Sequence, residues 1–250
     1  MVIGLEIFKE RFSSFKGQYT LIGGVACGLL MKEANLKFRE TKDFDIVMIL
    51  EALTNDFANA LWAFIKEGEY EYKEKSSEKP TFYRFSNPKK PNFPKIVELF
   101  SRNTSILDKP GDLNIIPIYL SDELSSLSAI LMDDNYYEFL LSGLIMIDGV
   151  QILGETHIIP FKAKAWLDLV QRKCEGSSID SKNINKHKND VFRLSQLLSE
   201  NTKIELTYAI KNDMTTFISS MKDIEITLPD IGVLGTTKAK VLELLSTVYL

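Results

Sequence analysis

YTLIGGVACGLLM, residues 19–31, and DFDIVMIL, residues 43–50, set the architecture of this chain. Residues 19–22 are typical of a short β-strand, and Gly23 and Gly24 end that strand before a helical segment. After its first carboxylates, DFDIVMIL is almost continuously apolar and β-branched, as in strands that are covered on both faces. Together the two stretches predict a strand, a tight glycine turn, a helix and a central strand of a sheet.

The pattern continues with mixed strands and helices up to about residue 155 and with helices only beyond it. Asp148-Gly149 between two apolar runs predicts a hairpin turn, and Pro160 is expected in the first turn of a helix. Further strands are predicted at residues 81–85, 95–101, 114–118, 144–147 and 151–153, and helices at residues 3–15, 25–33, 55–68, 122–132, 161–173, 185–199, 204–221 and 236–249. The predicted class is α+β, a mixed β-sheet flanked by helices (residues 1–155) and followed by a helical part (residues 156–250).

Composition indicates an ordinary globular protein. With 250 residues, of which 45% are hydrophobic and 26% charged, the chain can bury a core without metals or disulfides, and disordered or low-complexity classes are excluded. Its apolar runs are too short to span a bilayer and its start does not resemble a secretory signal, so no membrane association is expected. Cys27 and Cys174 are far apart without metal-ligand spacing, which favours a reducing compartment such as the cytoplasm.

Charge is unevenly distributed along the chain. The net charge of -4 argues against a general nucleic-acid coat protein that binds by phosphate neutralisation alone. The segment from Lys162 to Arg193 is different, with eight Lys or Arg residues against four Asp or Glu. Such a segment is most often a solvated helical surface, and otherwise it collects a phosphate-bearing ligand. Charge alone leaves both interpretations open.

Three acidic residues stand out on apolar strands. Asp43 and Asp45 are two apart on one predicted strand, so their carboxylates share a face, and Glu98 interrupts the apolar strand IVELF. Buried carboxylates repel one another unless a cation compensates them, and Mg²⁺ binds carboxylate and phosphate oxygens. The sequence therefore predicts a Mg²⁺ or Mn²⁺ site in which all three are catalytic. The alternatives are a solvated strand start for the aspartates and an exposed edge strand for Glu98.

Gly23 and Gly24 suggest a phosphate-binding turn. Glycines between a strand and a helix permit close backbone approach and leave the first helical N–H groups available to phosphate. The chain has no GxxxxGK[ST] loop, and LIGGVACG is not a GxGxxG motif, so neither the Walker-type nor the Rossmann interpretation is supported.

These motifs resemble the nucleotidyltransferase fold, specifically the AbiEii/AbiGii-type toxin-like family, whose members carry a Gly-Gly or Gly-Ser turn followed by Arg-x-[Ser/Thr]-x-Asp-hydrophobic-Asp. The matching residues are Gly23, Gly24, Arg39, Thr41, Asp43 and Asp45. The resemblance implies that Gly23, Gly24 and Arg39 bind nucleotide. On the residues alone, Arg39 could equally pair with Glu40 or Glu33.

The second half of the chain resembles two helices of the same family, through FKAKAW and KHKNDVFRLSQLL. By this similarity Lys164 meets the nucleotide phosphates and Asp190 closes the site. The pattern departs from the family at Asn189, where a basic residue is usual, and at Arg193, which replaces a second Asp. On the residues alone, an ion pair between Lys164 and Asp168, one turn apart, is the structural alternative.

The resemblance implies a metal-dependent nucleotidyltransferase that moves a nucleoside monophosphate from a nucleoside triphosphate to an acceptor, with release of pyrophosphate. The acceptor could be an RNA end, a protein or a small molecule such as an antibiotic. A toxin of this family would act in the cytoplasm and would have a cognate antitoxin. The alternative is a catalytically silent module of the same fold that binds a nucleotide or a protein.

Overall fold

The computed structural model describes residues 2–71, 82–102, 127 and 129–250. The chain forms two compact units, and each unit is assembled from separated segments. Unit 1 consists of Met1–Leu29, Arg39–Leu120 and Leu144–Leu153, and unit 2 consists of Leu30–Phe38, Ser121–Gly143 and Gly154–Leu250.

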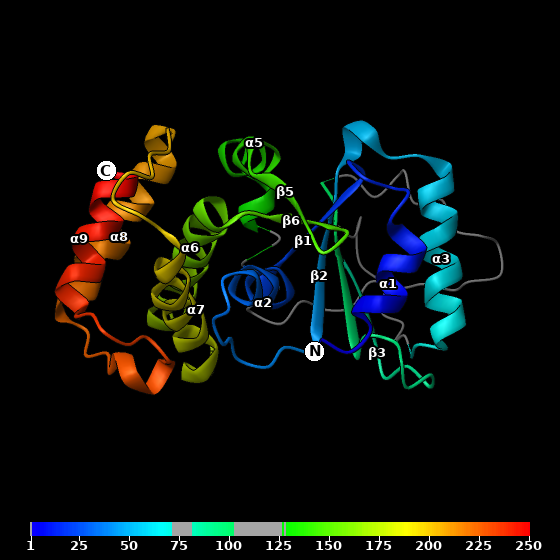
Figure 1. The fold of residues 1–250 in the computed structure, drawn as a ribbon, viewed down its shortest axis with the longest axis horizontal. Coiled ribbons are helices and arrows are strands. Elements are labelled where there is room, and N and C mark those ends of the chain that lie inside the picture. Colours follow the sequence, from blue (N-terminus) through cyan, green and yellow to red (C-terminus); the bar gives the residue numbers. More distant parts are fainter. Residues whose placement is uncertain (1, 72–81, 103–126, 128) are drawn as a thin grey trace. The chain divides into compact units, whose positions relative to one another are not determined.

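Unit 1 is built on a six-stranded mixed sheet with the order β3-β4-β2-β1-β6-β5 (Figure 1). The strands are β1 (Tyr19–Ile22), β2 (Asp43–Met48), β3 (Phe82–Ser86), β4 (Ile96–Phe100), β5 (Leu144–Ile147) and β6 (Val150–Leu153). β2 runs parallel to β4 and antiparallel to β1, and β3 is antiparallel to β4. The helices of unit 1 are α1 (Leu5–Phe12), α2 (Gly23–Glu33), which continues into unit 2, the 3₁₀ helix η1 (Leu50–Ala52) and α3 (Asn55–Gly68). The α+β class predicted from the sequence is confirmed.

Helices α1 and α3 cover one face of this sheet with aromatic side chains (Figure 1). The Phe8 ring on α1 lies 5.5 Å from the Phe44 ring on β2, and the Phe57 ring on α3 stacks on Tyr19 of β1 at 6.1 Å. Because side chains alternate along a strand, Phe44 on this apolar face places its neighbours Asp43 and Asp45 on the opposite face. The aromatic core thus fixes the direction in which the two aspartates point.

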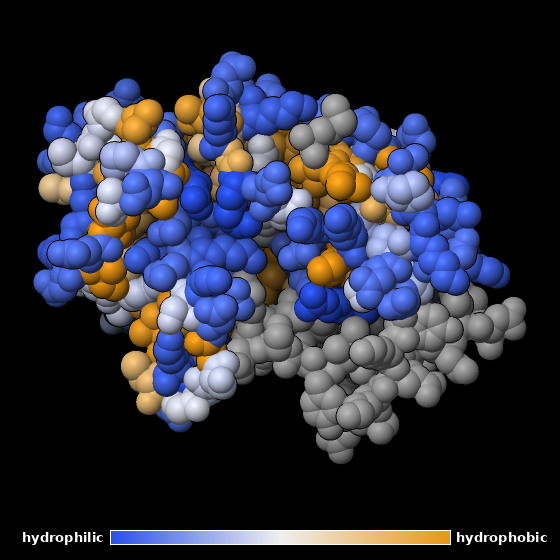
Figure 2. Space-filling view, turned by 90° about the horizontal axis from the view of Figure 1, so that it is seen from below, coloured by the Kyte–Doolittle hydropathy of each residue, from blue (hydrophilic) through white to orange (hydrophobic). Residues whose placement is uncertain are grey.

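The described residues of unit 2 are mainly helical, and unit 2 contains two segments, Leu30–Phe38 and Ser121–Gly143, besides the predicted helical part. Its elements are α5 (Asp134–Ser142), α6 (Glu155–Cys174), α7 (Ser181–Leu194), η2 (Ser195–Leu197), α8 (Tyr208–Asp223), η3 (Leu228–Ile231) and α9 (Lys238–Tyr249). α6 packs on α7 and α8, and α8 packs on α9. No helix in the part of the chain that the structure describes is long and apolar enough to cross a membrane. On the face shown in Figure 2, hydrophilic residues predominate and hydrophobic ones gather in small separate patches.

The start of α6 was predicted wrongly. The helix begins at Glu155, so Pro160 lies inside it rather than in its first turn. A proline there has no N–H to donate to the carbonyl four residues earlier, that of Thr156. The hydroxyl of Tyr249 on α9 donates to this Thr156 oxygen at 3.0 Å instead. Tyr249, 93 residues later in the chain, therefore satisfies the carbonyl oxygen that lacks its helical N–H donor because of the proline.

Other local predictions had mixed outcomes. Asp148 and Gly149 have φ values of 51° and 80°, which confirms the predicted tight turn between β5 and β6. Helix α5 was not predicted, although its N-cap Asp133 accepts hydrogen bonds from two backbone N–H groups of the first turn. The predicted strand at 114–118 and most of the predicted helix at 122–132 lie outside the described residues.

Candidate functional site

The two predicted acidic strands are neighbours, and their carboxylates face each other. β2 and β4 pair in parallel with Asp45 opposite Glu98 and Asp43 opposite Ile96. Paired residues in a sheet point to the same face, so Glu98 lies beside Asp45, to which its side chain is hydrogen bonded. Asp43 and Asp45 are partly exposed, whereas the Glu98 side chain is only 6% exposed. The exposed edge strand does not describe Glu98, because β4 lies between β3 and β2, whereas the two aspartates at the start of β2 keep contact with solvent.

Asp43, Asp45 and Glu98 are called the acidic row below. Arg84 on β3 lies next to this row, and the sequence analysis missed it. It lies directly opposite Glu98 in the antiparallel β3–β4 pair, and its Nη1 is 3.4 Å from Glu98 Oε1. The arginine is about one third exposed, so its guanidinium lies between the buried acid and solvent. A single arginine in the strand FYRFS carries no signal of its own, because only the register of β3 with β4 shows which residue it faces.

The pKa of Glu98 is unusually high for a glutamate. Burial raises the pKa of Glu98 to about 10, and the Asp45 carboxylate adds to this rise through its charge and its hydrogen bond. Arg84 opposes the rise, and Asp43 adds a smaller increase. The raised pKa favours the protonated form of Glu98, in which this side chain can donate to Asp45.

The glycine turn lies against the same aspartate. Ile22, the last residue of β1, pairs with Asp45, and the next residue, Gly23, has a φ of +65°. A Cβ atom on Gly23 would lie 1.7 Å from Asp45 Oδ2, so only glycine allows this approach. A Cβ atom on Gly24 would lie 2.3 Å from the Thr41 hydroxyl oxygen. The start of α2, Asp45 and Thr41 are thus packed together without intervening side chains.

Arg39 lies in the segment that leads into β2. Its Nη1 is 3.4 Å from the carbonyl oxygen of Glu40, to which it donates. This contact is with the backbone of Glu40, so it does not test a side-chain pair with Glu40 or Glu33.

Lys164 belongs to unit 2, where it is about one third exposed. Its Nζ donates to Asp213 on α8 at 3.0 Å, and Asp213 also accepts from the Tyr136 hydroxyl at 3.0 Å. Asp168 instead pairs with Arg172 at 2.9 Å. The structural alternative of a Lys164–Asp168 pair is wrong, since the partner of Lys164 lies on a different helix.

Asp190 also belongs to unit 2, and its side chain is fully buried. It contacts two cations, Lys162 Nζ at 3.4 Å and Arg193 Nη1 at 3.0 Å. Arg193 also donates to the carbonyl oxygen of Ile231 at 3.0 Å. Arg193, which replaces the family's second Asp, therefore compensates Asp190 and ties α7 to η3.

The donor set of the acidic row fits a hard divalent cation, because it consists of carboxylate oxygens with one buried acid that lacks full compensation. The arrangement is not a finished metal cage. Within the described ranges, no three His, Cys, Asp or Glu side chains are grouped so that they could hold a metal ion. Metal binding would require Glu98 to lose its proton and to loosen its contact with Arg84.

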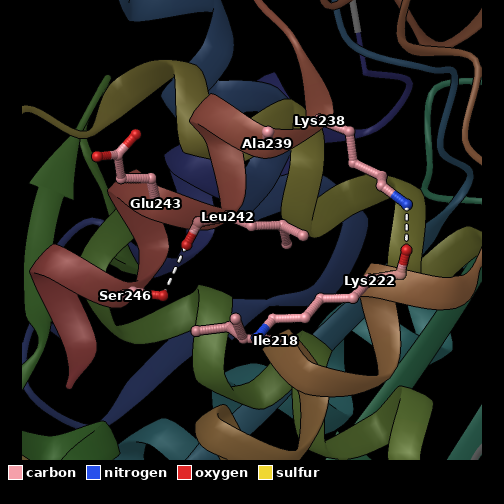
Figure 3. A pocket seen from close by; sticks show the side chains of 7 residues that line it. All are labelled: Ile218, Lys222, Lys238, Ala239, Leu242, Glu243 and Ser246. Carbon is pink, nitrogen blue, oxygen red and sulfur yellow. Dashed lines mark hydrogen bonds between the residues drawn. The ribbon is translucent and has the colours of Figure 1, made fainter.

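A separate pocket of about 400 Å³ lies between α8 and α9 in unit 2 (Figure 3). Two of its polar side chains, Lys238 and Ser246, have partners within these two helices and the loop after α8. Lys238 Nζ donates to the carbonyl oxygens of Lys222 and Ile224 at 2.7 and 3.1 Å, and the Ser246 hydroxyl donates to that of Leu242 at 2.8 Å. The pocket therefore offers less chemistry than the acidic row.

Comparison with known proteins gives a limited result. No protein-family model matches the chain, and no curated protein matches it. Among solved structures, it is similar to an antigenic nucleotidyltransferase-like protein from Paracoccidioides brasiliensis, with 15% identity and a TM-score of 0.44 over 96% of this chain and 94% of that one. It is also similar to the antibiotic-resistance factor ANT(2'')-Ia, with 12% identity and a TM-score of 0.38 over 86% of this chain and 91% of that one. At these scores the likeness carries no further weight, and the AbiEii/AbiGii resemblance stays a prediction.

Proposed function

We propose that this chain is a metal-dependent nucleotidyltransferase. The observation that supports it most is the register of β2 with β4, which sets the buried Glu98 beside Asp45, while the Gly23 turn packs against the same aspartate. A phosphate-binding backbone next to incompletely neutralised carboxylates is the arrangement that phosphoryl chemistry needs.

Each residue has a distinct task in this proposal. Asp43 and Asp45 would hold Mg²⁺ or Mn²⁺, which would supply charge neutralisation for the phosphates, and Glu98 would either complete a second metal site or act as the general base. Backbone N–H groups at the start of α2, exposed by Gly23 and Gly24, bind the triphosphate. The acceptor hydroxyl attacks the α-phosphorus, the bond to pyrophosphate breaks, and the Glu98 carboxylate, once ionised, takes the acceptor proton.

The family resemblance adds finer roles that remain proposals. It assigns nucleotide contacts to Arg39, Lys164 and Asp190, of which Lys164 is exposed enough to exchange Asp213 for a phosphate. Asp190 is fully buried between two cations, so it would act by holding α7 rather than by touching the nucleotide. A toxin role predicts that expression slows growth, that Asp43→Ala relieves the effect and that a cognate antitoxin exists. Equal toxicity of both forms would contradict this role.

Transfer of label from an α-labelled nucleoside triphosphate tests the enzymatic proposal. Wild type with Mg²⁺ or Mn²⁺ should label an RNA, protein or small-molecule acceptor, and Asp45→Asn should abolish the labelling. Asp56→Asn makes the same change at an exposed position of α3 and should retain activity. Labelling that survives in Asp45→Asn would refute the mechanism.

One observation favours a second candidate, a catalytically silent module that binds a nucleotide or a protein. Glu98 already has a cationic partner in Arg84, and the described acids do not form a finished metal cage. This candidate predicts nucleotide binding that is indifferent to Mg²⁺ and no labelling of any acceptor. Isothermal titration with and without Mg²⁺ separates the two candidates.

A further inference from the structure

Four residues form one line across the sheet of unit 1. Ile22 at the end of β1 pairs with Asp45 on β2, Asp45 pairs with Glu98 on β4, and Glu98 pairs with Arg84 on β3. Residues paired in this way point to the same face. The line therefore begins next to the Gly23 turn, passes through two acids and ends at an arginine.

The spacing of strands separates the two ends of this line. Neighbouring strands lie about 4.8 Å apart, so Arg84 is about 10 Å from the Asp45 position and about 14 Å from β1. The glycine turn next to Asp45 serves the triphosphate in the proposed function, and Glu98 lies between that turn and Arg84. The guanidinium thus lies on the opposite side of Glu98 from the glycine turn.

Most N–H donors of Arg84 are available to a ligand. Within the described part of the chain, its one polar side-chain contact is between Nη1 and Glu98 Oε1 at 3.4 Å. A guanidinium carries five N–H donors in a planar fork that matches two oxygens of a phosphate. At one-third exposure, the remaining donors of Arg84 can reach a ligand.

We propose that Arg84 is a specificity-determining residue that binds a phosphate group of the acceptor, next to the hydroxyl that receives the nucleotide. Its role rests on the proposed function, since an acceptor exists only if the chain transfers nucleotides. The acceptor oxygen forms the new bond to the α-phosphorus, the bond to pyrophosphate breaks, and the proton goes to Glu98. Arg84 makes and breaks no bond, and it selects which hydroxyl is placed there.

This placement favours one class among the acceptors left open by the sequence. A hydroxyl that neighbours a phosphate, as in a mononucleotide or at the end of an RNA strand, would meet the guanidinium with opposite charge. A cationic acceptor without phosphate, such as an aminoglycoside, would be repelled.

The experiment compares acceptors that differ in phosphate: a short oligoribonucleotide, adenosine 5′-monophosphate, adenosine and kanamycin. The wild type is expected to prefer the first two. Arg84→Gln should lower the ratio of kcat/KM for adenosine 5′-monophosphate over adenosine by about tenfold, the effect of one charge-assisted hydrogen bond. The salt dependence of KM for the oligoribonucleotide should flatten by about 0.7 in log–log slope. Arg84→Lys should keep the salt slope, and Lys89→Gln, an exposed position on the β3–β4 hairpin, should keep both values.

Three outcomes would overturn the role of Arg84. An equal loss of kcat for all acceptors in Arg84→Gln would mean that the arginine only supports Glu98. A higher KM for the nucleoside triphosphate would make it a donor contact, and kanamycin as the preferred acceptor would exclude phosphate recognition. Hydrolysis of the nucleoside triphosphate to nucleoside monophosphate and pyrophosphate, in which water replaces the acceptor and which requires Asp45, tests the proposed function separately. If wild type shows no such hydrolysis and no transfer to any acceptor, the proposed function is refuted. The proposed role of Arg84 is then refuted as well, because it depends on that function.

Discussion

Replacing Glu98 by glutamine should stabilise the protein while abolishing its activity. The Glu98 side chain is 6% exposed and is hydrogen bonded to Asp45, with Arg84 on its other side. Glutamine keeps the shape and can still donate to Asp45, but it has no proton to lose. The substitution therefore removes an ionisation that the folded chain resists.

The size of the effect follows from the pKa of Glu98, which is about 10 in the folded chain against 4.5 for the ordinary group. Between these values the folded state binds more protons than the unfolded state, so the free energy of unfolding of wild type falls as pH rises. The fall is at most about 1.4 kcal/mol per pH unit, or about 4 kcal/mol from pH 5 to pH 8. We expect about half of that, because Arg84 and local relaxation compensate the charge.

Thermal unfolding in EDTA measures this difference. At about pH 8, Glu98→Gln should unfold roughly 4–8 °C above wild type, and the gain should shrink towards about pH 5. Glu10→Gln makes the same change at an exposed position of α1 and should leave Tm within about 1 °C. A Glu98→Gln variant that is less stable than wild type at pH 8 would show that its ion pair with Arg84 outweighs its burial.

Added Mg²⁺ should make wild type more stable than Glu98→Gln. A cation that binds the folded chain alone raises stability by RT ln(1 + [Mg²⁺]/Kd), about 2.7 kcal/mol at a hundredfold excess over Kd. Wild type should gain this increment and Glu98→Gln should not, because an amide is a weaker ligand for Mg²⁺ than a carboxylate. Equal shifts in both proteins would place the metal elsewhere.

Two further substitutions probe the glycine turn and the buried ion cluster. Gly23→Ala should destabilise by about 1–3 kcal/mol and abolish nucleotide binding in a titration, because its Cβ collides with Asp45 Oδ2 at a φ of +65°. Gly17→Ala carries similar strain at a φ of +85° with no atom within 4 Å, and should keep binding. Asp190→Asn should lower the free energy of unfolding in urea by about 3–5 kcal/mol, because it leaves two cations inside unit 2 without their anion. Asp230→Asn, at an exposed position, should change it by less than about 0.5 kcal/mol, and a similar loss in both would show that Asp190 is not the electrostatic centre of the cluster.

The fold could be predicted wherever its cause is local. The apolar run of β2 and the positive-φ pair Asp148-Gly149 carry their structure in their own residues, and both were predicted correctly. The start of α6 was not, because a proline is expected at the first turn of a helix. Its tolerance inside α6 depends on Tyr249, 93 residues beyond Thr156, and no local pattern reports such a partner.

The same division applies to the candidate site. Asp43 and Asp45 share a face by strand geometry alone, and Glu98 was conspicuous as one acid in an apolar strand. Arg84 could not be found in this way, since it joins the acids only through the pairing of β3 with β4. The alternative partner considered for Lys164, Asp168, is wrong because the partner it has, Asp213, is 49 residues away on another helix.

Two carboxylates are buried in the part of the chain that the structure describes, and their comparison shows why Glu98 is the better candidate for function. Asp190 has cations at 3.4 and 3.0 Å, which compensate its charge within the fold. Glu98 has one cation at 3.4 Å and hydrogen-bonds another carboxylate, and its pKa rises accordingly. A chain gains no stability from such an acid, since an apolar or amide side chain would fit with less penalty. Its position is explained if a positive charge joins Asp45 and Glu98 during function, which is what the Mg²⁺ titration of wild type against Glu98→Gln measures.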